Sequence, residues 1–138
     1  MGTNKYKKYH KQTTNRKNEK DNLRTLRKGF FGFRITESGL ITKKQLEIIR
    51  RVITRITNRT GKIFLNINCN QPLTKKPFLS RMGKGTGDIY SWISYVKKGK
   101  IIVEIKDLPK KLAIIAFKAV QYRLPIKMLF IEREVIDV

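Results

Sequence analysis

The sequence of 138 residues has one cysteine, one histidine and no long apolar run. Cys69 has no second cysteine in the chain, so an intramolecular disulfide is excluded, which suits a reducing compartment. Because His10 is the single histidine, a zinc site of the usual cysteine and histidine type cannot be assembled. The apolar stretches are far shorter than the ~20 residues of a membrane-spanning helix, so we expect no membrane span.

Acidic residues are also scarce, since 10 Asp and Glu stand against 32 Lys and Arg, for a net charge of +22. A compact domain with this charge repels itself unless a polyanion neutralises it. Nucleic acid is the usual polyanion, because each phosphate contact releases a counterion, and an anionic membrane surface is the alternative. We expect a nucleic-acid partner and no self-oligomer.

The sequence shows no arrangement of catalytic groups. His10 lies in a basic N-terminal segment, which leaves no histidine base with a rigid partner. The acids are scattered along the chain, and Asp88 and Glu104 have no paired carboxylate at a useful spacing. We therefore expect no enzyme, no cofactor and no metal site, and an RNA-processing enzyme that uses these two acids is the weakest alternative.

The glycine-rich segment RMGKGTG, residues 81–87, invites two nucleotide-binding interpretations, and both fail. The dinucleotide pattern G-x-G-x-x-G, started at Gly83, requires a glycine where Asp88 stands. The phosphate-binding pattern G-x-x-x-x-G-K-[ST] fails because Gly85 follows Lys84. The glycines instead allow close approach of the backbone to another molecule, with Arg81 and Lys84 supplying charge. We expect this loop to reach folded RNA, and an ordinary flexible loop is the alternative.

Residues 1–28 form a basic segment that contains ten lysines and arginines and two acids. Such a segment buries too little apolar surface to fold alone, so it reads as an arm that orders along nucleic acid. Tyr6 and Tyr9 can then stack on bases. The alternative interpretation of this segment is a solvated tail. Residues 29–138 are expected to form a single α+β domain.

Periodicity predicts a helix from Lys43 to about Arg59, with Thr42 as its N-cap and Gly61 as its stop. Apolar residues at spacings of three and four form its buried stripe, and Arg51, Arg55 and Arg59 are expected in one exposed row. A second helix should begin near Pro109 and end before residues 124–125.

Alternating apolar residues predict strands elsewhere in the chain. Residues 29–41 read as a strand or irregular hairpin, and residues 89–96 and 100–105 as two strands around a tight turn. Residues 71–80 contain two prolines and are expected to be an extended loop. The predicted architecture is two helices packed on a mixed, mainly antiparallel sheet.

Several motifs resemble one family over nearly the whole chain. The most specific are GLITKKQLEIIRRVITR (39–55) and RMGKGTG (81–87), with KYKKYHK (5–11), GKIFLNI (61–67), QPLTKKP (71–77) and LPIKMLFIE (124–132) in support. They resemble the sixteenth protein of the bacterial-type large ribosomal subunit. Three departures from that pattern concern possible RNA contacts: Thr86 replaces a lysine, Phe64 a tryptophan and Asn58 a basic residue.

The resemblance implies an α/β-hammerhead-like sandwich that binds large-subunit rRNA at the base of the central protuberance. It also implies a role in organising the A-site tRNA and the peptidyl-transferase region, with neighbouring ribosomal proteins as further partners. A free nucleic-acid-binding regulator or DNA-compacting protein is the alternative function. The expected close-approach loop near the A site is Arg81, Met82, Gly83, Lys84, Gly85, Thr86 and Gly87. The expected rRNA-binding residues are Lys5, Lys7, Lys8, Lys11, Arg16, Lys17, Arg50, Arg51, Arg55, Arg59, Lys62, Lys75, Lys76, Arg81 and Lys84.

Heavy use of lysine, isoleucine and asparagine indicates an AT-rich coding genome. We therefore expect a mitochondrial ribosomal protein of the matrix, with a plastid or a bacterial cytoplasm as alternatives. No apolar segment follows the basic N-terminal residues, so we expect no secretory signal.

Overall fold

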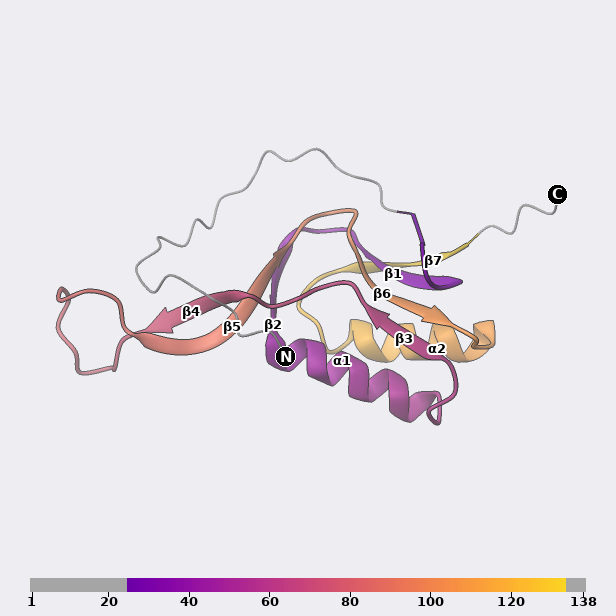
Figure 1. Ribbon diagram of the computed structural model, residues 1–138, viewed down its shortest axis with the longest axis horizontal. Helices are drawn as coiled ribbons and strands as arrows, with labels where there is room; N and C mark the ends of the chain where they lie inside the picture. Colours follow the sequence, from indigo (N-terminus) through magenta and orange to yellow (C-terminus); the bar gives the residue numbers. More distant parts are fainter. Residues whose placement is uncertain (1–24, 134–138) are drawn as a thin grey trace.

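The computed structural model describes residues 25–133, which hold two helices and seven strands in two antiparallel sheets (Figure 1). The predicted α+β class is confirmed. The expected arm residues between Lys5 and Lys17 lie outside the described range. Neither helix of this range is long and apolar enough to cross a membrane.

The larger sheet has four strands in the order β3 (Lys62–Leu65), β6 (Ile101–Lys106), β1 (Phe31–Ile35) and β7 (Met128–Glu132). Each neighbouring pair is antiparallel. Strand β6 is buried from Ile101 to Ile105, which fits its position inside the sheet.

The smaller sheet has three strands in the order β2 (Gly39–Thr42), β5 (Asp88–Val96) and β4 (Gln71–Lys75). Strands β1 and β2 follow each other in sequence but belong to different sheets, and so do β5 and β6. The predicted hairpins are therefore wrong. The connection between β5 and β6 bonds to the end of β1 instead: Gly99 N–H donates to Ile35 O, and Ile35 N–H donates to Lys100 O. This pairing joins the two sheets.

Strand β4 occupies residues 71–75 of the segment 71–80 that was predicted as an extended loop, and residues 76–80 lie outside any strand. Pro72 lies inside the strand, opposite Trp92 of β5. The strand is at an edge of its sheet, where one side has no ladder partner, so a proline is accommodated. Pro72 therefore lies in an edge strand, and Pro77 lies just beyond the end of that strand.

The helices α1 (Lys43–Ile56) and α2 (Lys110–Gln121) lie on the same side of the strands and run in opposite directions (Figure 1). The predicted N-cap of α1 is confirmed, since the Thr42 side chain accepts from Gln45 N–H and the Gln45 side chain accepts from Thr42 N–H. Pro109 is the N-cap of α2 and precedes its first turn.

The C-terminus of α1 differs from the prediction, because the helix ends at Ile56 and not near Arg59. Asn58 adopts a left-handed conformation (φ 49°), as does Arg59 (φ 63°). Asn58 N–H donates to Arg55 O and Arg59 N–H donates to Thr54 O, the two bonds of a Schellman motif. Arg59 is thereby turned off the helix, and the expected row of three arginines is reduced to two.

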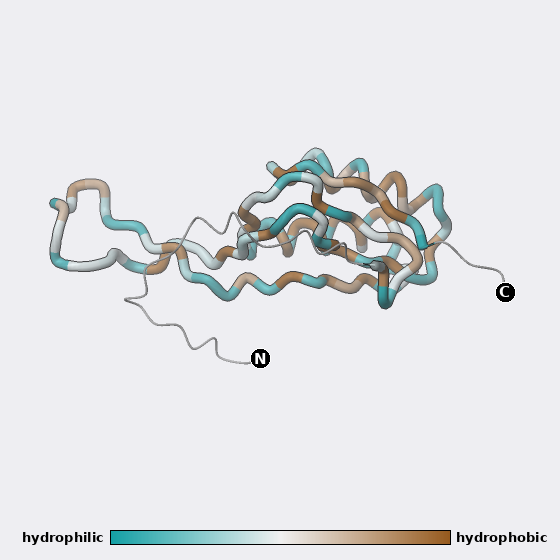
Figure 2. Tube along the Cα trace, turned by 90° about the horizontal axis from the view of Figure 1, so that it is seen from above, coloured by the Kyte–Doolittle hydropathy of each residue, from teal (hydrophilic) through white to brown (hydrophobic). Residues whose placement is uncertain are grey.

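Four phenylalanines hold α2 on the larger sheet. The Phe33 ring is fully buried, 5.2 Å from the Phe117 ring of α2 in an edge-on arrangement. Phe130 of β7 lies 5.8 Å from Phe117 and stacks on Phe31 at 5.6 Å. Edge-on and offset pairs add to the free energy gained from apolar burial, so this cluster fixes the helix layer. Figure 2 shows hydrophobic residues throughout the part of the molecule formed by the larger sheet and the two helices. It also shows them, separately, at the tip of the projecting hairpin formed by β4 and β5.

The opposite face of the larger sheet is covered by the first described residues. Gly32 and Glu104 pair across β1 and β6 and share this face. Leu26 lies over Gly32, and Glu104 accepts hydrogen bonds from the backbone N–H groups of Arg27, Lys28 and Gly29. The two central strands, β1 and β6, are consequently buried on both faces.

Candidate nucleic-acid interface

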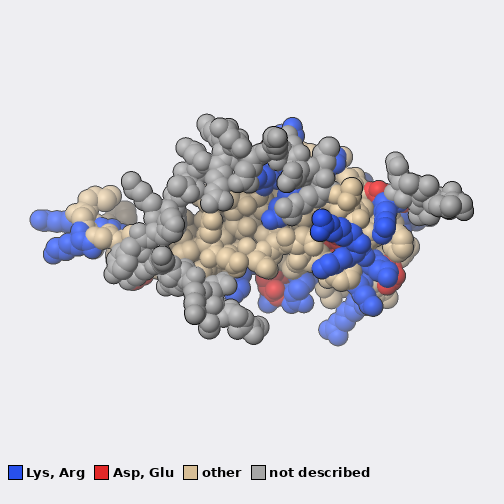
Figure 3. Space-filling view, turned by 45° about the horizontal axis from the view of Figure 1, so that its top comes forward, with Lys and Arg blue, Asp and Glu red and all other residues tan. Residues whose placement is uncertain are grey.

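Positive charge lies at both ends of the elongated molecule. Figure 3 shows lysines and arginines at the projecting end and again over the far end of the visible face, with few acids among them. The projecting end is the β4–β5 hairpin, and the far end includes the C-terminal end of α1 (Figure 1). The expected site residues of the described range therefore fall into two separate groups.

The first group lies on α1. Arg50 Nη2 is 2.6 Å and Arg51 Nε is 3.1 Å from the same oxygen, Oε1 of Glu47. The hydrogen bond from Arg50 is the main cause that lowers the pKa of Glu47, and the same bond raises the pKa of Arg50. These two arginines are thus partly engaged within the helix.

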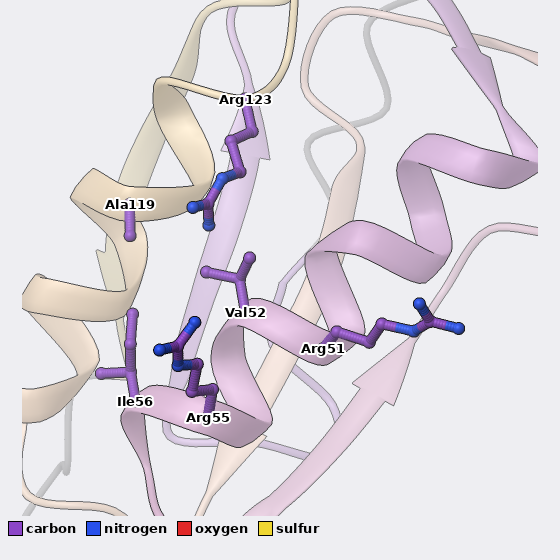
Figure 4. A pocket seen from close by; sticks show the side chains of 6 residues that line it. All are labelled: Arg51, Val52, Arg55, Ile56, Ala119 and Arg123. Carbon is purple, nitrogen blue, oxygen red and sulfur yellow. The ribbon is translucent and has the colours of Figure 1, made fainter.

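Arg55, one turn further along α1, has no carboxylate partner among residues 25–133. It lines a groove between the helices of about 360 Å³, together with Arg51, Val52, Ile56, Ala119 and Arg123. In Figure 4 the side chains of Arg55 and Arg123 point toward one another, and Arg51 points away. The sequence pattern did not reveal Arg123, because only the packing of the two helices brings it to Arg55.

The other two expected residues near this end lie outside α1. Arg59 is exposed in the turn after the helix, and Lys62 is exposed at the start of β3. They extend the cationic surface past the helix end.

The second group lies on the projecting hairpin, where residues 76–87 join β4 to β5 (Figure 1). Arg81 and Lys84 are exposed there. Three large apolar side chains accompany them, since Phe78 is 100%, Leu79 92% and Met82 94% exposed. Met82 belongs to the close-approach loop expected from the sequence, whereas Phe78 and Leu79 were not among the expected site residues.

The backbone of this loop requires its glycines for two different reasons. Gly83, Lys84 and Gly85 are successive left-handed residues, with φ of 107°, 57° and 90°. Gly87 is different, because a Cβ atom there would lie 2.4 Å from Lys75 O. The close approach that the sequence suggested is thus, at Gly87, an approach to the protein's own β4 strand.

Two lysines support the base of the loop. Lys75 Nζ lies 5.3 Å from the centre of the Tyr90 ring, a cation–π contact between β4 and β5. Lys76 Nζ donates a hydrogen bond to Gly83 O. Both are expected RNA-binding residues, and both also brace the loop.

The acids show no catalytic arrangement within the described residues. Glu104 is 3% exposed, and its two oxygens accept bonds from three backbone N–H groups and from Asn66. Asp88 is exposed at the start of β5. No group of three or more metal-ligating side chains occurs in residues 25–133. The exposed cations at the two ends of the molecule suit binding of a polyanion.

A comparison with known families decides the assignment. The family described as Ribosomal protein L16p/L10e matches residues 2–131. The chain belongs to the ribosomal protein L16p/L10e family. Membership confirms the resemblance drawn from the motifs and makes the chain a structural protein of the large ribosomal subunit. Partners of an L16p/L10e protein are rRNA and other ribosomal proteins, and the family is generally non-enzymatic.

Proposed function

We propose that this chain is anchored on large-subunit rRNA near the base of the central protuberance and helps to organise the A-site tRNA and the peptidyl-transferase region. The cations of α1, the following turn and β3 supply the anchor, together with the N-terminal arm residues Lys5–Lys17. Family membership supports the rRNA partner, and the net charge of +22 supports a polyanion as the main ligand.

The projecting hairpin is the observation that carries the proposal. Its tip presents Phe78, Leu79 and Met82 to solvent beside Arg81 and Lys84. Exposed apolar groups of this size mark a surface that becomes covered in an assembly. Nucleotides offer flat apolar base faces next to phosphates, and they match a tip that is both apolar and cationic. We infer that residues 81–87 contact functional RNA and the A-site tRNA.

Sedimentation of an extract at moderately high salt tests the ribosomal part. We expect the chain to co-migrate with the large ribosomal particle at salt that strips loosely bound basic proteins. Recovery at the top of the gradient, or with DNA, would contradict the proposal and favour a free nucleic-acid-binding protein.

A photo-crosslinking amino acid in place of Met82 tests the tRNA part. Purified particles carrying this variant should crosslink to tRNA when the A site is filled and not when it is empty. The same probe at Asn68, which is exposed on a loop away from the tip, serves as the control. Equal crosslinking from both positions would contradict the proposed role of the tip.

We also propose a mitochondrial ribosome as the site of action, on the lysine, isoleucine and asparagine bias. Immunodetection in purified mitochondria, plastids and cytosol tests this assignment. Detection in plastids or in a bacterial cytoplasm would replace it and leave the ribosomal function intact.

A further inference from the structure

Two arginines, one on α1 and one in the turn after α2, face each other across an apolar floor. Arg55 projects from α1 and Arg123 from the turn after α2, and their side chains point toward one another (Figure 4). Val52, Ile56 and Ala119 line the groove beside them. Antiparallel packing of α1 and α2 creates this arrangement, because it brings the end of α2 back beside α1.

Three arginines line the groove and no carboxylate does, and Arg51 pairs with Glu47 outside it, which leaves the charges of Arg55 and Arg123. Each guanidinium carries a positive charge. Neither forms an ion pair with an acid in residues 25–133, and the neighbouring Glu47 already binds Arg50 and Arg51. The carbonyl end of α2 contributes only about half of a negative charge. An anion from outside the chain would therefore remove the repulsion.

We propose that Arg55 and Arg123 together clamp one phosphodiester of the large-subunit rRNA, and this inference rests on the proposed rRNA anchor. Guanidinium groups match phosphate oxygens through paired, parallel N–H donors. The groove of about 360 Å³ is larger than a phosphate alone requires, so the adjoining ribose packs on its apolar floor. Arg123 thereby becomes an RNA-binding residue that the charge pattern of the sequence did not reveal.

Arg51 is the matched control for this site. It lies one turn before Arg55 on the same helix and lines the same groove, but its guanidinium pairs with Glu47 and points away (Figure 4). Arg51→Gln removes the same charge as Arg55→Gln from nearly the same place. Only the second substitution opens the clamp.

Ethylation interference on protein-free large-subunit rRNA, with the full-length chain, tests the clamp directly. Ethylation removes the charge of one phosphate at a time, so each contacted phosphate is identified by lost binding. We expect one interference position that disappears in Arg55→Gln and also in Arg123→Gln, while it persists in Arg51→Gln. If Arg55→Gln and Arg123→Gln lose two different interference positions, the clamp is refuted. It is also refuted if Arg51→Gln loses the same position as they do.

Affinity and its salt dependence give a second measurement. Each single variant should bind about tenfold more weakly. The double variant should lose less than the product of the two, because both side chains hold one phosphate. Its slope of log K against log salt should fall by roughly 0.7–0.9, whereas two separate phosphates would give roughly 1.4–1.8. Circular dichroism should show all variants folded.

The remaining outcomes separate the clamp from the broader function. Wild-type binding to rRNA that neither variant changes would refute the clamp and leave the rRNA anchor standing. Crosslinking of the groove to an acidic ribosomal protein, with unchanged rRNA binding, would refute it in favour of a protein partner. Failure of the wild-type chain to bind large-subunit rRNA would instead reject the proposed function itself.

Discussion

Glu104 on β6 accepts a hydrogen bond of 2.9 Å from the backbone N–H of Gly29, a residue 75 positions earlier in the chain. The same oxygen, Oε2, accepts from Lys28 N–H at 2.7 Å and from Arg27 N–H at 3.1 Å, and Asn66 Nδ2 donates to Oε1 at 2.7 Å. A single buried carboxylate thus fixes the segment that leads into β1.

Glu104→Gln should lower the free energy of unfolding by about 2–4 kcal/mol, measured by urea denaturation. The amide is neutral and has one acceptor oxygen, so every one of these donors loses its charged partner and some lose their acceptor altogether. Glu132→Gln is the control, because Glu132 makes an exposed ion pair with Lys110 and should cost less than about 1 kcal/mol. Equal effects of the two substitutions would contradict the anchoring role.

The stability of the chain in acid should depend on the same carboxylate. Burial alone would raise the pKa of Glu104, but the bonds from Gly29, Lys28, Asn66 and Arg27 outweigh burial and hold it below the ordinary value. The unfolded chain then binds more protons than the folded one, so this stabilisation is present above a pH of about 4.5 and is lost as the pH falls through the folded pKa. Between about pH 5 and 3, the free energy of unfolding should fall more steeply in wild type than in Glu104→Gln. Parallel curves would contradict the lowered pKa.

Gly87→Ala should disrupt the base of the projecting hairpin. The new Cβ would lie 2.4 Å from Lys75 O and 2.5 Å from Lys75 C, so β4 and β5 must separate there. Hydrogen exchange should become faster at the β4–β5 amides and stay unchanged in the larger sheet. Gly83→Ala is the matched control, because its Cβ meets no atom within 4 Å and only its backbone conformation is strained. It should leave exchange in β4 and β5 unchanged.

Asn58 should respond in opposite directions to two small substitutions. Its φ of 49° is readily adopted by glycine and costs alanine energy. We expect Asn58→Gly to raise the free energy of unfolding by about 0.5–1 kcal/mol and Asn58→Ala to lower it by about 1 kcal/mol. Changes of the same sign in urea titrations would show that the Schellman motif does not end α1.

Thr86→Lys should strengthen binding to large-subunit rRNA if the hairpin tip contacts a phosphate. One added contact should steepen the slope of log K against log salt by roughly 0.7–0.9. Asn68→Lys adds the same charge away from the tip and should change the slope less. If the slope steepens equally in Thr86→Lys and Asn68→Lys, the effect comes from net charge alone and the predicted contact at the tip is contradicted.

Local signals predicted the helices and the fold class. The apolar spacing of α1 and the capping residue Thr42 act within a few residues of each other, so a sequence pattern is sufficient to identify them. The end of α1 was missed because Asn58 and not Gly61 supplies the first left-handed residue.

Strand partners could not be predicted in the same way. Strand β5 precedes β6 by only a short turn, yet β6 pairs with β1 and β3, which lie far away in sequence. Alternation of apolar residues indicates which face of a strand is buried, but it does not indicate which other strand pairs with it. Arg123 escaped prediction for the same reason, since its position depends on how two helices pack.

Strand β5 runs for nine residues, with one irregularity of register at Tyr90, from the exposed Asp88 at the hairpin to the buried Ile93 and Val96 in the interior. At about 3.3 Å per residue it acts as a lever of roughly 30 Å, and a rotation of about 5° at its inner end would move the outer end by more than 2 Å. The direction in which the loop of residues 76–87 projects is therefore set by packing in the protein interior. Repacking around Ile93 would redirect the loop without altering a single residue in it.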